Sequence, residues 1–240
     1  MDYRENSDKS VFEAREKIIQ RYGKDVIDTV DQYPLFAGPQ TMLRYAKIYE
    51  LLKKSLEIPG NIVEFGTWKG STAIFMAKIL NEIEPQSVRK IIVFDNFSGL
   101  PEPSLKDGNY AKSQIGNYLG NRESLEFIIN SYNLNHRLEL VEGDANETVP
   151  KYFEQNKTTI VSLAYFDFDL YEPTIKAWHS IKNCLIKGSQ LIFDEGLDSR
   201  YWLGECKVVK EIINDIDFKN KIVVTPNKLS RQPEIILSIN

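Results

Sequence analysis

The sequence predicts an α/β fold: a doubly wound, mostly parallel seven-stranded sheet that ends in an antiparallel hairpin. Two observations support this prediction. From residue 61 to residue 216, short apolar runs alternate with longer amphipathic segments, as expected when crossover helices join parallel strands. The last two strand-like segments, 221–225 and 233–239, are separated only by residues 226–232, which is too short for a helical crossover. We therefore expect these two strands to pair as a hairpin at the sheet edge.

The elements before the hairpin follow from the same patterns. Residues 41–56 carry a broad apolar face and, like residues 10–22, are expected to be helical, with 34–40 as an ordered connector. The fourth and fifth predicted strands are nearly continuous apolar runs, which is typical of strands covered on both faces. We expect strands at 61–65, 90–95, 137–142, 160–167 and 188–194, and helices at 71–83, 121–132, 147–155, 172–186 and 203–216.

Length and composition favour a single domain and disfavour several classes of function. With 240 residues and 42% apolar content, the chain can bury one full core, with residues 1–58 as a helical extension or lid. The 30 basic and 34 acidic residues are scattered, so no nucleic-acid surface is expected. No apolar run has the length of a membrane span or a secretion signal, and the two cysteines lack metal-site spacing. We therefore expect a reduced cytoplasmic protein, and a homo-oligomer stays open.

Residues 60–72 are the most informative segment. An apolar run ends in Glu64, glycines follow at Gly66 and Gly70, and Ser71 lies at the start of an amphipathic helix. A strand, a tight turn and a helix N-terminus together present free backbone N–H groups to a ligand. Because Glu64 would repel a phosphate, the segment favours a ligand with an ammonium beside a carboxylate. The methionine part of S-adenosylmethionine is such a ligand.

Acidic residues follow the end of every predicted parallel strand. Ligands of open α/β sheets bind beyond the carboxyl ends of the strands, so these acids are candidate site residues. Strand ends also meet solvent, where acids collect without a functional reason, but this alternative weakens when five successive strands share the feature. The acids are Glu64, Asp95, Asp144, Asp167, Asp169, Asp194 and Glu195.

Asp95 and Asp144 each have two interpretations. Asp95 is the expected ligand of ribose hydroxyls, and its alternative role is to cap the turn that follows it. Asp144, between Gly143 and Ala145, would bind an adenine amino group or cap the helix that starts near Glu147. The sequence leaves both alternatives open.

Asp167, Asp194 and Glu195 end neighbouring strands and are predicted to converge. Like charges so close repel unless a cation lies between them, and ligands with only oxygen atoms favour a hard ion such as Mg²⁺. The alternative is partial protonation or pairing with lysine or arginine. Asp169 is the candidate general base; it would otherwise cap the next helix, with His179 as the reserve base.

Four segments of the chain resemble the macrocin O-methyltransferase-like family, which are metal-dependent sugar O-methyltransferases with the class I methyltransferase fold. These segments are Asn61–Gly70, Phe94–Pro101, Asp167–Thr174 and Ile192–Glu195. They keep their order, cover roughly residues 36–215, and the second and third together are fairly specific. The family usually has a second Asp and an aromatic residue where this chain has Glu195 and Gly196, which leaves the acceptor open.

The resemblance implies S-adenosylmethionine and Mg²⁺ as cofactors and a sugar-containing small molecule as the acceptor. It implies Mg²⁺ on Asp167, Asp194 and Glu195, and Asp169 as the general base. Apart from the resemblance, Tyr201 and Trp202 follow the last of these acids and are candidates for the wall of an acceptor pocket, with core packing as the alternative. The residues expected at the cofactor are Met42, Glu64, Gly66, Thr67, Ser71, Asp95, Asn96, Phe97, Gly143, Asp144, Ala145 and Asp167.

Three other functions compete with this interpretation. A metal-dependent glycosyltransferase would use Asp167 and Asp169 as an Asp-x-Asp motif, but it leaves the glycine turn and Asp95 unexplained. A non-catalytic nucleotide-binding module would require an inert carboxylate cluster. A dinucleotide dehydrogenase is disfavoured by the incomplete glycine fingerprint and by the terminal hairpin.

Overall fold

A computed structural model of the chain describes residues 3–197, 201–226 and 234–240. These residues form a seven-stranded sheet with the strand order β3-β2-β1-β4-β5-β7-β6. The first five strands pair in parallel, and β7 pairs antiparallel with both β5 and β6. The strands are β1 (Asn61–Phe65), β2 (Ile91–Asp95), β3 (Leu138–Glu142), β4 (Val161–Phe166), β5 (Leu185–Phe193), β6 (Ile222–Pro226) and β7 (Ile235–Ile239).

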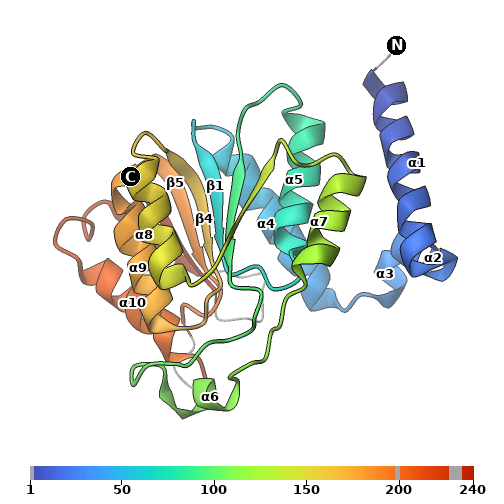
Figure 1. The fold of residues 1–240 in the computed structure, drawn as a ribbon. Coiled ribbons are helices and arrows are strands. Elements are labelled where there is room, and N and C mark those ends of the chain that lie inside the picture. The colour runs from blue at the N-terminus through green and yellow to red at the C-terminus, as the bar shows by residue number, and fades with distance from the viewer. Residues whose placement is uncertain (1–2, 198–200, 227–233) are drawn as a thin grey trace.

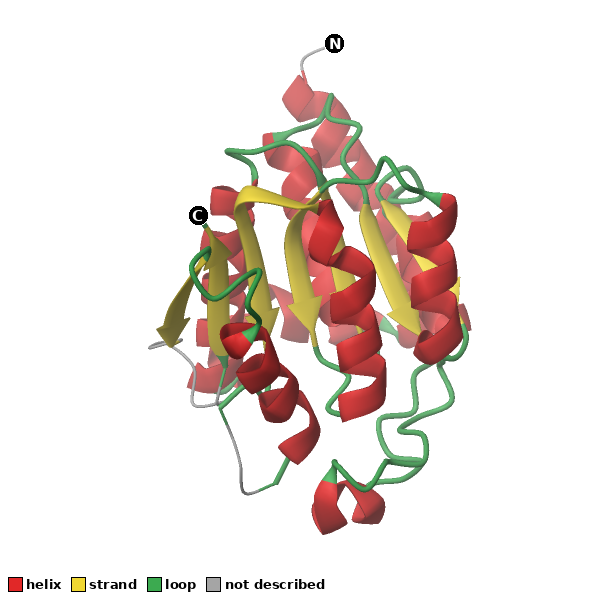
Figure 2. Ribbon diagram, turned by 90° about the vertical axis from the view of Figure 1, so that its left-hand side faces the viewer, coloured by secondary structure: helices red, strands yellow, loops and turns green. Residues whose placement is uncertain are grey.

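Helices cover both faces of the sheet (Figures 1 and 2). One layer consists of α4 (Pro39–Ser55), α5 (Ser71–Ile83) and α7 (Arg122–Ser131), and the other of α8 (Ala145–Gln155), α9 (Tyr171–Ile181) and α10 (Leu203–Asn214). Successive strand residues point to opposite faces, so each strand contributes to two cores. In β1, Ile62 packs with the first layer, and Val63 and Phe65 pack with the second.

The N-terminal helices differ in how they are held. α4 belongs to the core, because Ile48, Leu51 and Leu52 are buried against the sheet. α1 (Tyr3–Tyr22), α2 (Lys24–Asp31) and α3 (Tyr33–Phe36) lie outside this layer, beside α7 (Figure 1). The Arg21 guanidinium donates to the Glu123 carboxylate at 3.1 Å and lies 4.5 Å from the centre of the Phe127 ring. Surface contacts of this kind hold α1 to α7.

The predicted fold class and strand order along the chain are confirmed, and the differences lie at element boundaries. The predicted helix 172–186 ends at Ile181; a 3₁₀ turn, Lys182–Cys184, follows, and β5 begins at Leu185, earlier than expected. The predicted connector 34–40 is partly helical, with α3 ending at Phe36 and α4 beginning at Pro39. α2, α3 and α6 (Gly108–Ser113) were not predicted. The hairpin pairs as expected, although residues 227–233 lie outside the described ranges.

Within the described ranges, no helix has both the length and the apolar character needed to span a membrane.

Candidate active site

A cavity of about 800 Å³ opens at the carboxyl ends of the parallel strands. This volume lies within the range of roughly 300–1,000 Å³ that is typical of small-molecule sites. Two predicted cofactor residues do not line it: Met42 is exposed on α4, and the Phe97 side chain packs into the core. The predicted residues that line it are Glu64, Gly66, Thr67, Ser71, Asp95, Asn96, Gly143, Asp144, Ala145, Asp167, Asp169, Asp194 and Glu195.

The turn after β1 depends on Gly66. Its φ is +88°, and a Cβ at this position would lie 2.2 Å from the backbone oxygen of Asp167. Only glycine therefore allows the ends of β1 and β4 to approach so closely. The same turn carries two buried oxygens, Oε2 of Glu64 and Oγ1 of Thr67, that have no hydrogen-bond partner among the described residues. Burial, with the Asp167 carboxylate nearby, raises the pKa of Glu64 to about 8. A cationic donor in the cavity would satisfy this carboxylate.

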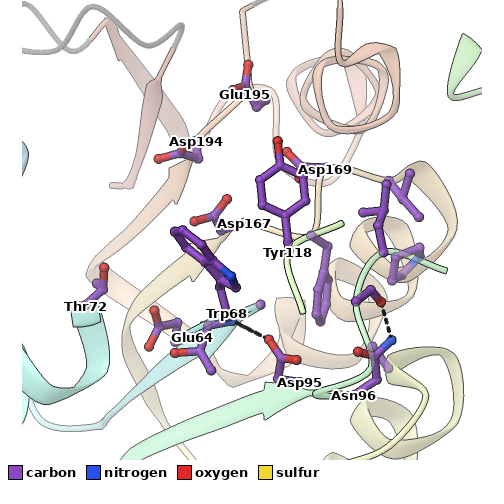
Figure 3. Close-up of a pocket in the computed structure, with 18 of the residues that line it drawn as sticks. Glu64, Trp68, Thr72, Asp95, Asn96, Tyr118, Asp167, Asp169, Asp194 and Glu195 are labelled. Carbon is purple, nitrogen blue, oxygen red and sulfur yellow. Dashed lines mark hydrogen bonds between the residues drawn. The ribbon is translucent and has the colours of Figure 1, made fainter. Parts of the chain in front are cut away.

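Asp95 connects the turns after β1 and β2 through hydrogen bonds to their backbone. Its carboxylate accepts hydrogen bonds from the backbone N–H groups of Thr67 at 2.7 Å, Trp68 at 3.0 Å and Phe97 at 2.7 Å (Figure 3). Trp68 and Phe97 both have a positive φ, which is unfavourable for residues other than glycine. The capping alternative predicted for Asp95 is therefore present in the structure. Carboxylates have about four acceptor positions, so capacity for a ribose hydroxyl remains.

Asp144 shows its capping alternative as well. Its side chain accepts from the backbone N–H of Asn146 at 2.8 Å, and it is the N-cap of α8. Asp144 also lines the cavity, together with Gly143 and Ala145. Contact with a ligand and capping of the helix are therefore compatible at this position.

Asp167 and Asp194 face a guanidinium that the sequence analysis did not identify. Nη2 of Arg44 donates to Oδ2 of Asp167 at 3.2 Å and lies 4.0 Å from Oδ1 of Asp194. The Tyr165 hydroxyl donates to Asp194. Burial and the neighbouring Asp194 raise the pKa of Asp167 to about 8, while Arg44 opposes this shift. The alternative of pairing with arginine is thus present at the predicted metal site.

Glu195 does not complete the predicted convergence. In Figure 3 its carboxylate lies apart from those of Asp167 and Asp194. Its backbone N–H donates to Oε2 of the buried Glu205 at 2.8 Å, and this bond fixes the chain direction just after β5. β5 ends at Phe193, and Asp194 and Glu195 lie in the turn that follows it, where the two side chains take different directions. Among the residues that the structure describes, no three Asp, Glu, His or Cys side chains are placed around one ion.

Asp169 does not cap the helix that follows it. The N-cap of α9 is Leu170, and no side chain of that residue caps the helix. Instead, Oδ1 of Asp107 accepts the Tyr171 N–H at 2.6 Å. Asp169 lines the cavity, and burial with the neighbouring Asp167 raises its pKa well above its ordinary value. The reserve base His179 is exposed on α9 and does not line the cavity.

Aromatic rings form one wall of the cavity, from Trp68 in the β1 turn to Trp202 before α10. Trp68, Tyr118 and Trp202 line the cavity, and Tyr118 lies beside Asp169 in Figure 3. Ring centres are 6.1 Å apart for Trp68 and Tyr118 and 6.3 Å apart for Tyr118 and Trp202. Tyr110 lies 5.1 Å from both Trp202 and Tyr201 and extends the wall outward. Trp202 was a predicted pocket residue, whereas the long segment between β2 and α7 gave no signal for Tyr118.

The sequence of the chain matches the model of one protein family over most of its length. The family model described as Macrocin-O-methyltransferase (TylF) matches residues 13–222.

The chain belongs to the macrocin O-methyltransferase family.

This membership confirms the predicted family, and it makes the chain an enzyme of a methyltransferase family. The family's usual aromatic residue after β5 has a structural reason to be absent here. A Cβ at Gly196 would lie 2.3 Å from Cγ2 of Ile235 on β7, so this turn has no space for a side chain.

A curated relative and two solved structures are similar to this family member. The 8-demethyl-8-(2,3-dimethoxy-alpha-L-rhamnosyl)-tetracenomycin-C 4'-O-methyltransferase of Streptomyces olivaceus is 26% identical over 145 residues, 58% of this chain. The match spans 53% of that relative, so the chain covers about half of its length. The calicheamicin methyltransferase CalS11 is 27% identical with a TM-score of 0.76, covering 99% of this chain and 94% of its own.

A second structure, of apo CalS11, is described as a TDP-rhamnose 3'-O-methyltransferase. It is also 27% identical, with a TM-score of 0.70 over 99% of this chain and 96% of its own. These full-length matches confirm the predicted class I methyltransferase fold.

Proposed function

We propose that the chain transfers a methyl group from S-adenosylmethionine to a hydroxyl of a sugar-containing small molecule, with Mg²⁺ assisting. One observation carries this proposal: the buried Glu64, whose Oε2 has no hydrogen-bond partner among the described residues, shares its cavity with Asp169, an aspartate suited to act as a base. Glu64 is on the side of the β1 turn, and Asp169 is on the side of the aromatic wall. A methyl donor and an acceptor bound on these two sides would meet between them.

S-adenosylmethionine fits the residues of the β1, β2 and β3 ends. The partnerless Oε2 of Glu64 would accept the ammonium of the methionine part, which removes the cost of an unsatisfied buried acceptor. The turn that Asp95 orders, with Thr67 and Asn96 on the cavity wall, would hold the ribose. The Gly143–Ala145 turn would contact the adenine, and Ser71 places the N-terminus of α5 at the same cavity.

Asp169 would accept the proton of the acceptor hydroxyl as the hydroxyl oxygen forms a bond to the methyl carbon and the S–CH₃ bond of the sulfonium breaks, leaving the neutral thioether S-adenosylhomocysteine. A sugar hydroxyl is nearly as weak an acid as water, with a pKa of about 15.7, so this proton needs an acceptor within hydrogen-bond reach. Burial and the neighbouring Asp167 raise the pKa of Asp169, which makes its ionised form a stronger proton acceptor than an ordinary carboxylate. Trp202 is buried at this side of the cavity, and the Tyr118 hydroxyl, whose pKa is raised by burial and by the nearby Asp169 carboxylate, would offer the acceptor a second polar contact.

The carboxylate oxygens at the ends of β4 and β5 are ligands of the kind that Mg²⁺ prefers. In the structure, two of these carboxylates, Asp167 and Asp194, face Arg44. Asp167 and Asp194 would hold the ion through oxygen atoms, which hard divalent cations prefer, and Glu195 would have to turn toward them to join the predicted ligand set. A bound cation of this kind lowers the pKa of a coordinated hydroxyl. The residues themselves supply a reason for positive charge here, because burial and mutual repulsion already penalise the ionised carboxylates.

The charge of the cavity favours a neutral or cationic acceptor. Among the described lining residues, Arg44 is the only basic one. The acids are Glu64, Asp95, Glu142, Asp144, Asp167, Asp169, Asp194 and Glu195. A nucleoside-diphosphate sugar would bring negative charge into this field, whereas an uncharged glycoside would bind without that penalty. We therefore favour a glycosylated small molecule over a nucleotide-sugar, and the same field disfavours the glycosyltransferase alternative.

We also propose that residues 1–58 act as a lid on a single methyltransferase domain. The support is that α4 contributes Gln40, Thr41, Arg44 and Tyr45 to the cavity wall, while α1–α3 lie outside the core. The cytoplasmic location and the homo-oligomer stay predictions from the sequence.

A calorimetric titration with S-adenosylmethionine tests the donor site. Asp95→Ala removes the acceptor of three backbone N–H groups, so we expect at least about tenfold weaker binding. Glu139→Gln, a charge change on β3 outside the cavity, is the control and should bind like the wild type. Unchanged affinity of Asp95→Ala would remove Asp95 from the site. A labelled-methyl transfer screen over neutral glycosides and nucleotide-sugars, with and without Mg²⁺, then tests the acceptor and the ion.

A further inference from the structure

Arg44 is the one basic residue that reaches the cavity among the residues that the structure describes. It lies near the N-terminus of α4, and its side chain is 29% exposed. Nη2 contacts carboxylates from two neighbouring strands, Asp167 at 3.2 Å and Asp194 at 4.0 Å. The guanidinium also lies 5.7 Å from the centre of the Tyr165 ring, whose hydroxyl donates to Asp194. A single cationic group thus faces the two carboxylates beyond the ends of β4 and β5 and offsets part of their negative charge.

A guanidinium and a divalent cation cannot hold the same two oxygens at once. Mg²⁺ binds carboxylate oxygens at about 2.0–2.1 Å. An ion held by Oδ2 of Asp167 and Oδ1 of Asp194 would compete for the same oxygens that Nη2 of Arg44 faces at 3.2 and 4.0 Å. The two cations also repel each other strongly at this separation in a buried site.

We propose that Arg44 is a built-in competitor for the divalent cation: it offsets part of the negative charge of the Asp167–Asp194 pair when the ion is absent and must leave the pair when the ion binds. This inference rests on the proposed Mg²⁺ site, but it concerns a residue outside the expected ligand set. It explains how carboxylates on adjacent strands, one of them fully buried, remain compatible with a folded protein that holds no ion.

The competition would also couple ion binding to α4. The second half of this helix is fixed by the buried Ile48, Leu51 and Leu52. The first half of the helix lines the cavity. The hydrogen bond from Arg44 to Asp167 connects this half to the end of β4. Loss of that bond on ion binding would free the first half of α4 to adjust to the cofactor and the acceptor.

The test is a calorimetric titration of Mg²⁺ into the chelator-treated protein at constant ionic strength. Arg44→Met keeps the aliphatic stem and removes the competitor, so we expect Mg²⁺ to bind about tenfold or more tightly than in the wild type. Lys47→Met is the matched control, because Lys47 lies one turn further along α4 and pairs with Glu50 at 3.3 Å instead of the strand acids. Its Mg²⁺ affinity should stay within about twofold of the wild type.

Thermal melting gives an independent readout. In the presence of chelator, Arg44→Met should melt below the wild type, because two carboxylates lose their counter-charge, and Mg²⁺ should raise its melting temperature more than that of the wild type. Arg44→Lys keeps the positive charge and serves as the second variant if Arg44→Met does not fold. Its Mg²⁺ affinity should lie between those of the wild type and Arg44→Met. Equal Mg²⁺ affinity in the wild type and both Arg44 variants would overturn the competition and leave the ion site standing. Absence of Mg²⁺ binding in all of them would overturn both.

Discussion

Asp169 is the residue on which the proposed chemistry depends most directly. Its backbone has a φ of +63°, a conformation that is costly for residues other than glycine and often found at functional sites. The conformation turns the chain between the end of β4 and α9, so the side chain faces the cavity instead of capping the helix. The helix does not need Asp169 as a cap, because Asp107 binds the Tyr171 N–H.

Replacement of Asp169 by asparagine should therefore affect turnover and little else. Asparagine keeps the shape and tolerates a positive φ, but it cannot accept the hydroxyl proton. We expect kcat to fall by roughly 10²–10⁴-fold, while S-adenosylmethionine affinity measured by calorimetry holds. His179→Ala is the control, because His179 is exposed on α9. A loss of turnover in His179→Ala, with Asp169→Asn active, would show that the base is assigned wrongly.

The sequence predicted which residue types surround the cavity better than it predicted their partners. Glu64 and Asp95 follow strand ends, and strand ends can be located from apolar runs alone. The partners come from distant segments: Arg44 precedes Asp167 by 123 residues, and its place on the cavity depends on how α4 packs. The i, i+3 and i+4 spacing of Thr41, Arg44 and Tyr45 was the available signal, since these residues share one helix face.

At the scale of elements, the buried Asp107 joins three segments close to the cavity residue Leu170. Oδ1 accepts the first N–H of α9, and Oδ2 accepts from the backbone and hydroxyl of Ser104 at 2.7 Å each. A Cβ at Gly204 in the first turn of α10 would lie 2.2 Å from Oδ1, so that helix packs directly against the carboxylate. The side chain is almost fully buried. This one residue therefore fixes the loop before α6 relative to α9 and α10.

Asp107→Ala should destabilise the fold and weaken the contacts between the loop before α6 and the helices α9 and α10. It leaves buried N–H groups without an acceptor, at a cost of about 1–3 kcal/mol for each unsatisfied group. For a chain of this length, each kcal/mol corresponds to about 2–4 °C in melting temperature, so we expect a fall of several degrees by calorimetry. Asp107→Asn keeps one acceptor oxygen and should lose less. Equal melting temperatures of Asp107→Ala and the wild type would contradict the structural role.

The elements that the sequence failed to predict lie where periodicity is short. Strands β1 and β2 are apolar runs bounded by turn residues, so their positions were predicted closely. α6 is a short helix in the long connection after β2, and α3 contains a proline in its first turn. Helices of one or two turns carry too few residues to show a 3.6-residue period. Their positions are set by tertiary contacts such as those of Asp107.

At the scale of the whole molecule, buried carboxyl groups at the cavity make stability depend on pH. Burial raises the pKa of Glu64 and of Asp167 to about 8, and it raises the pKa values of Asp169 and Glu205 well above their ordinary range. In the unfolded chain these groups lose their protons near pH 4–4.5. Between that pH and about 8, the folded state therefore holds more protons than the unfolded state.

The sign of the pH dependence follows from this difference. Stability supplied by a carboxyl group with a raised pKa is fully present below the pKa of the unfolded chain and is lost as pH rises through the pKa of the folded state. We expect the melting temperature of the chelator-treated, ligand-free protein to fall between pH 5 and pH 8. Each linked proton contributes a slope of about 1.4 kcal/mol per pH unit at most.

Glu64→Gln isolates one of these groups. Glutamine has a similar shape and cannot ionise, so this variant should gain several degrees relative to the wild type between pH 5 and pH 8. It should also bind S-adenosylmethionine at least about tenfold more weakly, because the ammonium loses its charged partner. Glu139→Gln, outside the cavity on β3, should follow the wild-type curve. Parallel melting curves for Glu64→Gln and the wild type across this range would mean that Glu64 titrates as a solvated carboxylate. The buried acceptor proposed for the ammonium would then have to be sought elsewhere in the cavity.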